Sequence, residues 1–209
     1  MTDTLTLYTN PMSRGRIARW MLEEVGQPYE TKILGYDGAM KAPAYLAINP
    51  MGKVPALVHG QTVVTEVAAI CAYLADAFPA AGLAPAPNAA SRGPYYRWLF
   101  FAAGPLEAAV TDKALGVTVP YDKKMMAGYG DFATVMDVLE DALSVDGWLA
   151  GDRFSAADLY VGAHVMWGLQ FGSIEKRPAF EAFAARLAER PAHRRATEID
   201  DGAMPDQAR

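Results

Sequence analysis

The sequence has few of the residues that form disulfides or bind metals, namely cysteine and histidine. Its 209 residues include one cysteine, which excludes a disulfide within the chain and a cysteine-rich zinc site. Three histidines, His59, His164 and His193, lie far apart and lack the spacing of metal ligands. We therefore expect no metal, and a single thiol favours a reducing cytoplasm as the compartment.

The sequence also lacks the marks of two large classes of partner. Its net charge of −5 argues against the basic face of a nucleic-acid-binding protein. No apolar run approaches the roughly 18 residues that span a bilayer, and residues 1–8 lack the basic, apolar and small-residue pattern of a signal peptide. We expect a folded cytoplasmic protein with neither a nucleic-acid nor a membrane partner.

The periodicity of apolar residues changes along the chain and predicts two domains. Up to residue 78, strand-like runs alternate with apolar residues spaced three and four apart. The expected elements are strand 4–9, helix 13–26, strand 29–34, strands 54–58 and 62–65, and a helix from 66 to 78. The first three form a βαβ unit with parallel strands, and a ββα unit follows. Residues 1–78 are therefore expected to form a thioredoxin-like α/β domain.

The remainder of the chain is expected to be an all-helical domain. Residues 79–88 contain three prolines and form the expected linker, because proline interrupts a helix. Within residues 89–209 the pattern predicts helices over 91–110, 122–145 and 179–189. Ser155 and Asp158 have the spacing of a capping box at the start of a further helix. From Thr197 onward the chain is polar, and we expect it to be loose.

One stretch combines a turn, a strand and an unusually placed proline. The segment Asn49-Pro-Met-Gly-Lys-Val-Pro-Ala-Leu57 puts Pro55 within a strand, where it removes a hydrogen-bond donor from the ladder. If the peptide bond before Pro55 is cis, the backbone N–H and C=O of Val54 turn outward and stay unpaired. Both groups could then pair with an extended peptide that adds itself to the sheet edge.

This stretch and the segment Val63-Val-Thr-Glu-Val-Ala-Ala-Ile-Cys-Ala-Tyr-Leu74 resemble the glutathione transferase superfamily, and especially its cytosolic, serine-type bacterial members. The resemblance covers nearly the whole chain, most strongly residues 4–78. It implies a cis proline at Pro55, a tripeptide held by the backbone of Lys53 and Val54, and a γ-glutamyl amino group bound by Glu66. It also implies a homodimer with a role in detoxification.

Glutathione must lose its thiol proton before it can attack an electrophile. A hydroxyl donor or the N-terminus of a helix can stabilise the resulting thiolate. In the superfamily the activating Tyr, Ser or Cys lies between the first strand and first helix, where this chain has Asn10-Pro-Met-Ser-Arg-Gly-Arg16. We favour Ser13 as the activating residue, and its alternative role is that of an ordinary helix N-cap.

Asn10 is the competing activator. When Arg14-Gly-Arg16 is laid on the similar Arg-Gly-Arg of tyrosine-type members, Asn10 falls where their Tyr stands, and an amide N–H can also donate to a thiolate. Tyr8 lies too early, within the strand. No cysteine occupies this segment, so a mixed disulfide with glutathione is not expected. Cys71 lies on the apolar stripe of a helix and is interpreted as a core residue.

Val67 is the main departure from the family pattern. Many members have Ser at this position, and its hydroxyl donates to the γ-glutamyl carboxylate. The loss of one hydrogen bond to a charged group costs roughly 1.5–3 kcal/mol, for which Thr65 or the helix terminus could compensate. Lys53 and Arg16 are candidates for the glycine-end carboxylate of glutathione, and their alternative role is that of solvated surface cations.

The second substrate is expected to lie where the helical domain faces Ser13, with Met12, Tyr96 and Trp167 as candidate pocket residues. The predicted function is that of a glutathione S-transferase, which conjugates the glutathione thiolate to small apolar electrophiles. Two alternatives remain open: a non-catalytic binding or scaffold protein of the same family, and a glutathione-dependent isomerase or peroxidase that uses the same site.

Overall fold

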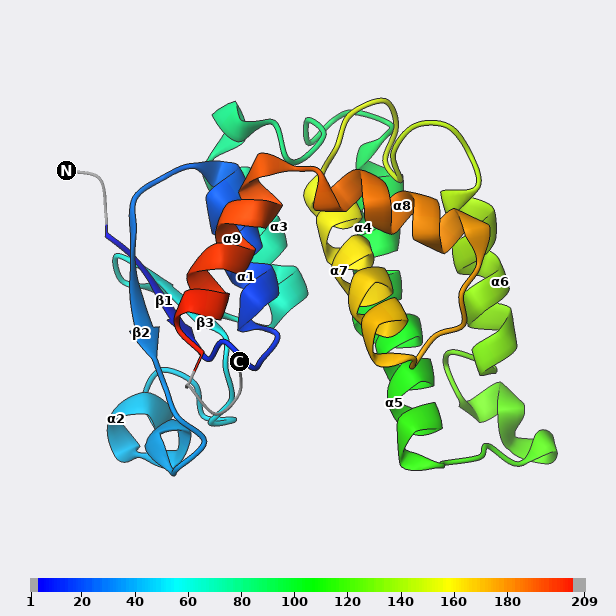
Figure 1. Ribbon diagram of the computed structural model, residues 1–209, viewed down its shortest axis with the longest axis horizontal. Coiled ribbons are helices and arrows are strands. Elements are labelled where there is room, and N and C mark those ends of the chain that lie inside the picture. Colours follow the sequence, from blue (N-terminus) through cyan, green and yellow to red (C-terminus); the bar gives the residue numbers. More distant parts are fainter. Residues whose placement is uncertain (1–3, 205–209) are drawn as a thin grey trace. The chain divides into compact units, whose positions relative to one another are not determined.

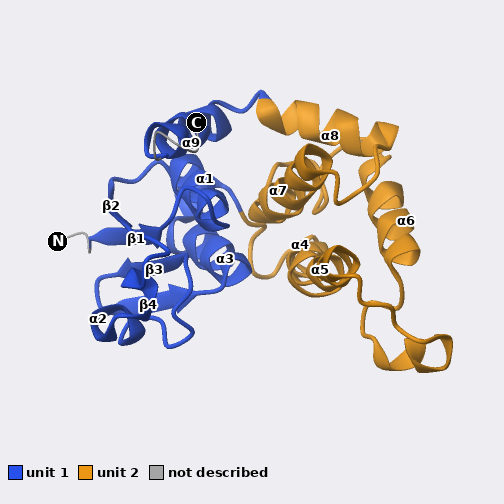
Figure 2. Cartoon of the chain, turned by 60° about the horizontal axis from the view of Figure 1, so that its bottom comes forward, with its two compact units in different colours: residues 1–83, 189–209 blue, residues 84–188 orange. Residues whose placement is uncertain are grey.

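The computed structural model describes residues 4–204. Within them the chain forms two compact units, one made of the residues up to 83 and from 189 onward, and the other of residues 84–188 (Figure 2). The first unit is a four-stranded sheet with helices, and the second unit is helical. The predicted thioredoxin-like domain followed by a helical region is confirmed.

The sheet has the strand order β2-β1-β3-β4. Its strands are β1 (Leu5–Thr9), β2 (Tyr29–Ile33), β3 (Ala56–His59) and β4 (Thr62–Thr65). Strand β2 pairs with β1 in parallel, whereas β1 with β3 and β3 with β4 pair antiparallel. The parallel pairing of β1 with β2 confirms the predicted βαβ unit, and the hairpin of β3 and β4 is joined to the other side of β1.

Three helices of this unit, α1 (Gly15–Val25), α3 (Val67–Ala77) and α9 (Pro191–Gly202), lie on one side of the sheet (Figures 1 and 2). The short helices η1 (Ala39–Lys41), α2 (Pro43–Leu46) and η2 (Pro79–Ala81) complete the unit. The core consists of fully buried apolar side chains from β1, β3, α1 and α3: Leu7, Met21, Leu22, Leu57, Ile70 and Leu74. Burial of such side chains contributes about 1.5–3 kcal/mol each.

In the second unit, one long helical stretch contains a π-helical turn. It consists of α4 (Arg92–Phe101), η3 (Ala102–Leu106) and α5 (Glu107–Leu115). Pro105 has no backbone N–H, so it cannot continue the α-helical bonding pattern, and the wider turn accommodates it. The helix expected over 91–110 is therefore present and continues five residues further, to Leu115.

The single helix expected over 122–145 is wrong in its first half. The structure has the 3₁₀ helix η4 (Tyr121–Met126) and then, after a break, α6 (Phe132–Leu143). Gly130, in the turn between the two segments, has a φ of 74°, a left-handed conformation that glycine tolerates. The side chain of Asp131 then accepts a hydrogen bond from the Thr134 N–H at 2.9 Å and caps α6.

The capping box at Ser155 is confirmed at the start of α7 (Ala156–Phe171). Asp158 is completely buried, and its carboxylate accepts hydrogen bonds from the backbone N–H groups of Ser155 at 2.9 Å and Leu149 at 2.7 Å. It thereby joins the preceding loop to the helix. The last helix of this unit is α8 (Pro178–Ala188).

The polar end of the chain is not loose, contrary to the sequence-based expectation. Helix α9 extends to Gly202 and packs on α1 in the first unit, although we expected residues 89–209 to belong to the helical domain. Ala192, Ala196 and Asp200 are its buried positions, spaced four apart along one face. The two alanines let the helices approach closely. Residues 205–209 of the expected loose tail lie outside the described residues.

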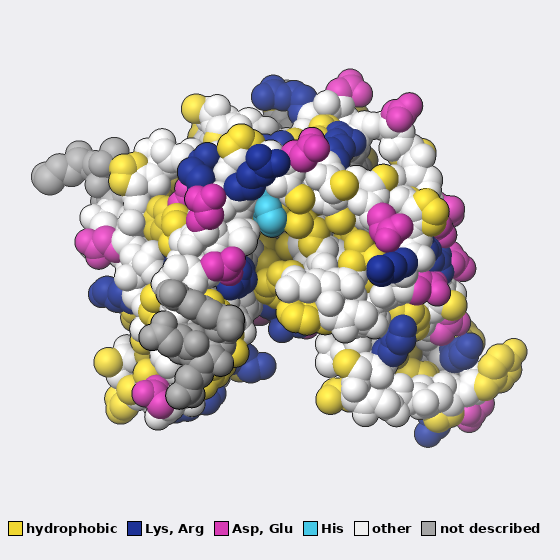
Figure 3. All heavy atoms as spheres, in the orientation of Figure 1, with side chains coloured by type: hydrophobic (Ala, Val, Ile, Leu, Met, Phe, Trp, Pro, Cys, Tyr) yellow, Lys and Arg dark blue, Asp and Glu magenta, His cyan; other side chains and the backbone are white. Residues whose placement is uncertain are grey.

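Charged side chains pair across α1 and α9 and explain why a polar sequence packs here. Arg190 binds Glu24 at 2.6 Å, Arg195 binds Glu23 at 3.1 Å, and the buried Arg19 binds Asp200 at 2.8 Å. Figure 3 shows basic and acidic side chains interspersed over the surface of this part of the molecule. These pairings depend on the folded arrangement and leave no periodic apolar signal in the sequence.

His193 makes the packing of α9 sensitive to pH. Its ring and that of Trp20 pack in a T-shaped arrangement with their centroids 4.7 Å apart. Burial lowers the pKa of His193, Glu24 partly opposes this effect, and Arg194 adds to it. A lowered folded-state pKa means that the unfolded chain binds the proton more tightly. We therefore expect the free energy of unfolding to fall as pH drops from about 6.5, the ordinary histidine value, through the folded-state pKa.

Urea unfolding at a series of pH values measures this effect. The variant His193→Gln cannot take up the proton, so its free energy of unfolding should depend less on pH between about 6.5 and the lower folded-state pKa. If the two proteins show the same dependence of unfolding free energy on pH, His193 is not the source of the effect.

Candidate functional site

Strand pairing brings three separate segments to one end of the sheet. Ala56, the first residue of β3, pairs with Tyr8 near the end of β1 and with Thr65 at the end of β4. The turn after β1, the segment before β3 and the start of α3 after β4 must therefore lie beside one another. These are the three segments in which the expected thiol-activating and tripeptide-binding residues occur.

The turn between β1 and α1 is held by the side chain of Asn10. Asn10 is buried, its Nδ2 donates to the Leu34 carbonyl at 2.8 Å, and its Oδ1 accepts from the Met12 N–H at 2.9 Å. The amide is thus engaged at both ends in bonds to backbone. Of the two expected activators, this arrangement favours Ser13 over Asn10.

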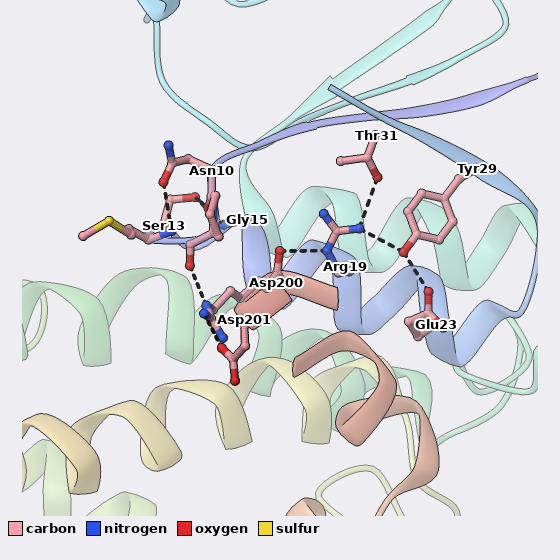
Figure 4. Close-up of polar contacts among 12 residues, drawn as sticks. Asn10, Ser13, Gly15, Arg19, Glu23, Tyr29, Thr31, Asp200 and Asp201 are labelled. Carbon is pink, nitrogen blue, oxygen red and sulfur yellow. Dashed lines mark hydrogen bonds and ion pairs between the residues drawn. The ribbon is translucent and has the colours of Figure 1, made fainter. Parts of the chain in front are cut away.

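Ser13 lies half-buried just before α1, and its hydroxyl bridges two backbone groups. Oγ donates to the Asn10 carbonyl at 2.7 Å and accepts from the Gly15 N–H at 2.9 Å (Figure 4). A serine hydroxyl has one proton to donate. It can donate to a sulfur by rotating away from Asn10, while the first N–H of α1 remains beside it.

Gly15 is required where α1 begins. A Cβ at this position would lie 1.9 Å from Oγ1 of Thr9 and 2.9 Å from Oγ of Ser13, distances that no real Cβ tolerates. The absence of a side chain allows the helix N-terminus to rest directly on the end of β1. It therefore keeps the positive end of the helix dipole next to Ser13.

The peptide bond between Val54 and Pro55 is cis, as the resemblance implies. The carbonyl of the preceding residue, Lys53, accepts hydrogen bonds from the Tyr45 hydroxyl at 2.6 Å and from Asn49 Nδ2 at 2.8 Å. Within the described residues, the N–H and C=O of Val54 have no hydrogen-bond partner. Side chains of the protein hold the carbonyl of Lys53, while the backbone groups of Val54 are available to pair with an extended peptide.

The braces provided by Tyr45 and Asn49 were not found by the sequence analysis. Asn49 followed by Pro50 has the sequence of an ordinary turn, whereas Asn49 is buried and donates to the carbonyl of Lys53, four residues later. Its Oδ1 also accepts from the Met51 N–H at 3.1 Å. An Asn before Pro is a common turn signal, so the local sequence cannot distinguish this second role.

Glu66 stands at the start of α3 in an unusual backbone conformation. Its φ of 64° and ψ of 120° make it the one non-glycine residue with positive φ among residues 4–204. Such conformations cost of order 1–3 kcal/mol and cluster at functional sites. Its side chain is exposed, whereas that of the following residue, Val67, is buried.

The two candidate cations differ in their surroundings. The Lys53 side chain is exposed. The guanidinium of Arg16 is already bonded within the unit, because Nε donates to the Pro11 carbonyl and Nη2 binds Asp201 Oδ1 at 2.7 Å. Lys53 is therefore more available to a ligand carboxylate than Arg16.

The expected pocket residues are spread over the two units. Met12 of the first unit is 57% exposed. In the second unit Tyr96 is 40% exposed and accepts a hydrogen bond from Arg92 at 2.7 Å, and Trp167 is half-buried. Their convergence on one electrophile pocket stays a prediction.

No group of three or more potential metal-ligating side chains occurs among the residues that the structure describes. In the same residues, no helix combines the length and the apolar character that crossing a membrane requires.

Comparisons with known proteins agree on one family. Residues 12–77 match the family model of the glutathione S-transferase N-terminal domain, and residues 110–191 match that of the C-terminal domain. A glutathione S-transferase of Xanthomonas campestris is 32% identical over 192 residues, which are 88% of this chain and 92% of the relative.

Solved structures give the same result. A glutathione transferase from Methylococcus capsulatus superposes with a TM-score of 0.78 at 30% identity, over 96% of this chain and 100% of that one. A theta class glutathione S-transferase from Xanthomonas axonopodis pv. citri, solved with glutathione bound, gives a TM-score of 0.75 at 30% identity, over 93% and 97% of the two chains.

Cys71 is confirmed as a core residue and yields a testable expectation. It is completely buried on α3, and burial raises the pKa of its thiol far above the ordinary value. Because the thiolate is the reactive form, we expect no alkylation of the native protein at neutral pH. Mass spectrometry after iodoacetamide treatment measures this, with the urea-unfolded chain as the control that is fully labelled. Rapid labelling of the native protein would contradict the burial.

Proposed function

The chain belongs to the glutathione S-transferase family, and we propose that it conjugates the glutathione thiolate to small apolar electrophiles. One observation carries the proposal: the register around Ala56 puts the open backbone of Val54, the strained Glu66 and the Ser13 turn at one end of the sheet. A tripeptide laid across this end would meet all three segments.

In the proposed complex the tripeptide adds to the sheet edge at Val54, next to the cis Pro55. The exposed carboxylate of Glu66 takes the γ-glutamyl amino group, and the start of α3 favours the γ-glutamyl carboxylate through its dipole. Thr65 and the backbone N–H of Val67 complete this end. Lys53 takes the glycine-end carboxylate, and Arg16 is the weaker candidate because its guanidinium is engaged elsewhere.

Ser13 is proposed to stabilise the thiolate. Rotation of its hydroxyl from the Asn10 carbonyl to the sulfur would exchange a neutral hydrogen bond for a charge-assisted one, which is the stronger kind. The first N–H groups of α1 would add their dipole. In a substitution, thiolate attack forms the carbon–sulfur bond while the leaving group departs with the electrons of its own bond to that carbon. In an addition, the π electrons of the attacked bond move onto the neighbouring atom, which then takes a proton from water.

A non-catalytic glutathione-binding protein is the second candidate. Two observations favour it: the Ser13 hydroxyl proton already has an acceptor, and Val67 offers no hydroxyl to the ligand. We further propose a cytoplasmic homodimer with a role in detoxification. That part rests on family membership alone.

The tripeptide site is tested with Glu66→Gln, which removes the charge and keeps the side-chain size. Gln still accepts a hydrogen bond but supplies no charge, and charge-assisted bonds are roughly twice as strong as neutral ones. Since a bond to a charged group contributes roughly 1.5–3 kcal/mol, glutathione should bind about three- to tenfold more weakly by calorimetry. Glu30→Gln, at an exposed acid on β2, is the matched control and should bind as the unmodified protein does. Equal affinity in all three proteins would refute the role of Glu66.

Activation is tested with Ser13→Ala. Loss of a donor that stabilises developing charge should lower kcat for a chlorodinitrobenzene electrophile by about tenfold or more. Ser13→Thr keeps a hydroxyl and should recover part of the rate, which separates the role of the hydroxyl from that of the turn. If Ser13→Ala retains full turnover, Ser13 does not activate the thiol. If the unmodified protein binds glutathione but has no turnover with a panel of electrophiles, it is a non-catalytic glutathione-binding protein.

A further inference from the structure

The last turn of α9 carries two acids where helix electrostatics disfavours them. Asp200 and Asp201 lie two residues and one residue before the end of the helix at Gly202, and no basic residue lies in that turn. The C-terminal end of a helix carries partial negative charge, so acidic side chains there are unfavourable. Their placement therefore needs an explanation from outside α9.

Both acids point to α1 (Figure 4). Asp200 is 1% exposed and binds Arg19 at 2.8 Å, which anchors the end of α9 against the middle of α1. Asp201 is 59% exposed and binds Arg16 at 2.7 Å. The first pair secures the helix, and the second reaches the first turn of α1.

Arg16 connects Asp201 to the turn that carries Ser13. Its Nε donates to the carbonyl of Pro11, which lies between Asn10 and Ser13 in the chain. The turn is thus held at its beginning by Asn10, which is bonded to Leu34, and in its middle by the guanidinium of Arg16. The orientation of Arg16 depends in turn on its ion pair with Asp201.

We propose that Asp201 is a positioning residue, which acts through Arg16 to hold the Asn10–Ser13 turn in the geometry that thiol activation needs. The inference rests on the proposed function. An ion pair this exposed contributes little to stability. The pair can affect the rate more than the stability, because it orients the turn that carries Ser13. A displacement of about 1 Å at a reacting group can cost on the order of a hundredfold in rate.

Asp201→Ala separates positioning from stability. Removal of an acid from a helix C-terminus does not weaken the helix, so the melting temperature should not fall. Arg16 loses its ion pair and holds the carbonyl of Pro11 less firmly, so we expect faster hydrogen–deuterium exchange in residues 10–16. With bound glutathione, the pKa of the thiol should rise by about one unit, which is a roughly tenfold loss of thiolate and of kcat at pH values below both pKa values.

Two controls accompany this variant. Arg195→Ala removes another ion pair between α9 and α1, that with Glu23, seven residues and two helical turns further along α1 from Arg16. It should leave exchange in residues 10–16 and the thiol pKa unchanged. Asp201→Asn keeps an acceptor oxygen for Arg16 and should recover part of the rate.

A double-mutant cycle tests whether Asp201 acts through Arg16. In an Arg16→Ala background, Asp201→Ala should have no further effect on kcat, because the connection is already broken. Additive losses would overturn the proposed route.

The remaining outcomes are distinct from one another. If hydrogen–deuterium exchange in residues 10–16 is unchanged in Asp201→Ala, Asp201 does not hold the turn, whatever the activity of the variant. Faster exchange with an unchanged thiol pKa and kcat overturns the positioning role. Failure of the unmodified protein to bind glutathione refutes the proposed function itself, and the positioning role with it.

Discussion

The pairing of β3 with both β1 and β4 is the constraint on which the rest of the site depends. Ala56 is opposite Tyr8 on one side and Thr65 on the other. This register places the turn after β1, the segment before β3 and the start of α3 at the same end of the sheet. A shift of one residue in either ladder would turn every side chain of that strand to the other face. Leu57, completely buried next to Ala56, would then leave the core, which makes such a shift costly.

Polar side chains then hold the irregular segments that the sheet brings together. Asn10 holds the turn before α1, Asn49 and Tyr45 hold the carbonyl of Lys53, and Arg16 holds the carbonyl of Pro11. Each of these bonds ends on a backbone atom of a segment without regular secondary structure. Buried backbone polar groups need partners, and here side chains provide them while the N–H and C=O of Val54 remain available.

The contact between α1 and α9 shows how ionic pairing can dock a helix with few apolar residues. Arg19 is 1% exposed, and burial raises the pKa of Asp200 while the guanidinium of Arg19 opposes that rise. Within the described residues, Asp200 Oδ2 has no hydrogen-bond partner, so the pair is not fully compensated. A buried pair of this kind adds little net stability, but removal of one partner costs roughly 3–5 kcal/mol, because the other charge is left alone. It therefore specifies where α9 docks more than how strongly.

Patterns with a local physical cause were determined by the sequence itself. Alternation in β1, helical spacing in α1 and α3, the capping box at Ser155 and the burial of Cys71 follow from side-chain chemistry within a few residues. The tertiary structure alone decided features that arise between distant residues. Helix α9 joins α1 through charges that look solvated in the sequence, and Arg16 binds Asp201, which lies 185 residues away along the chain. Periodicity cannot report such contacts, because each charge looks the same whether water or a partner neutralises it.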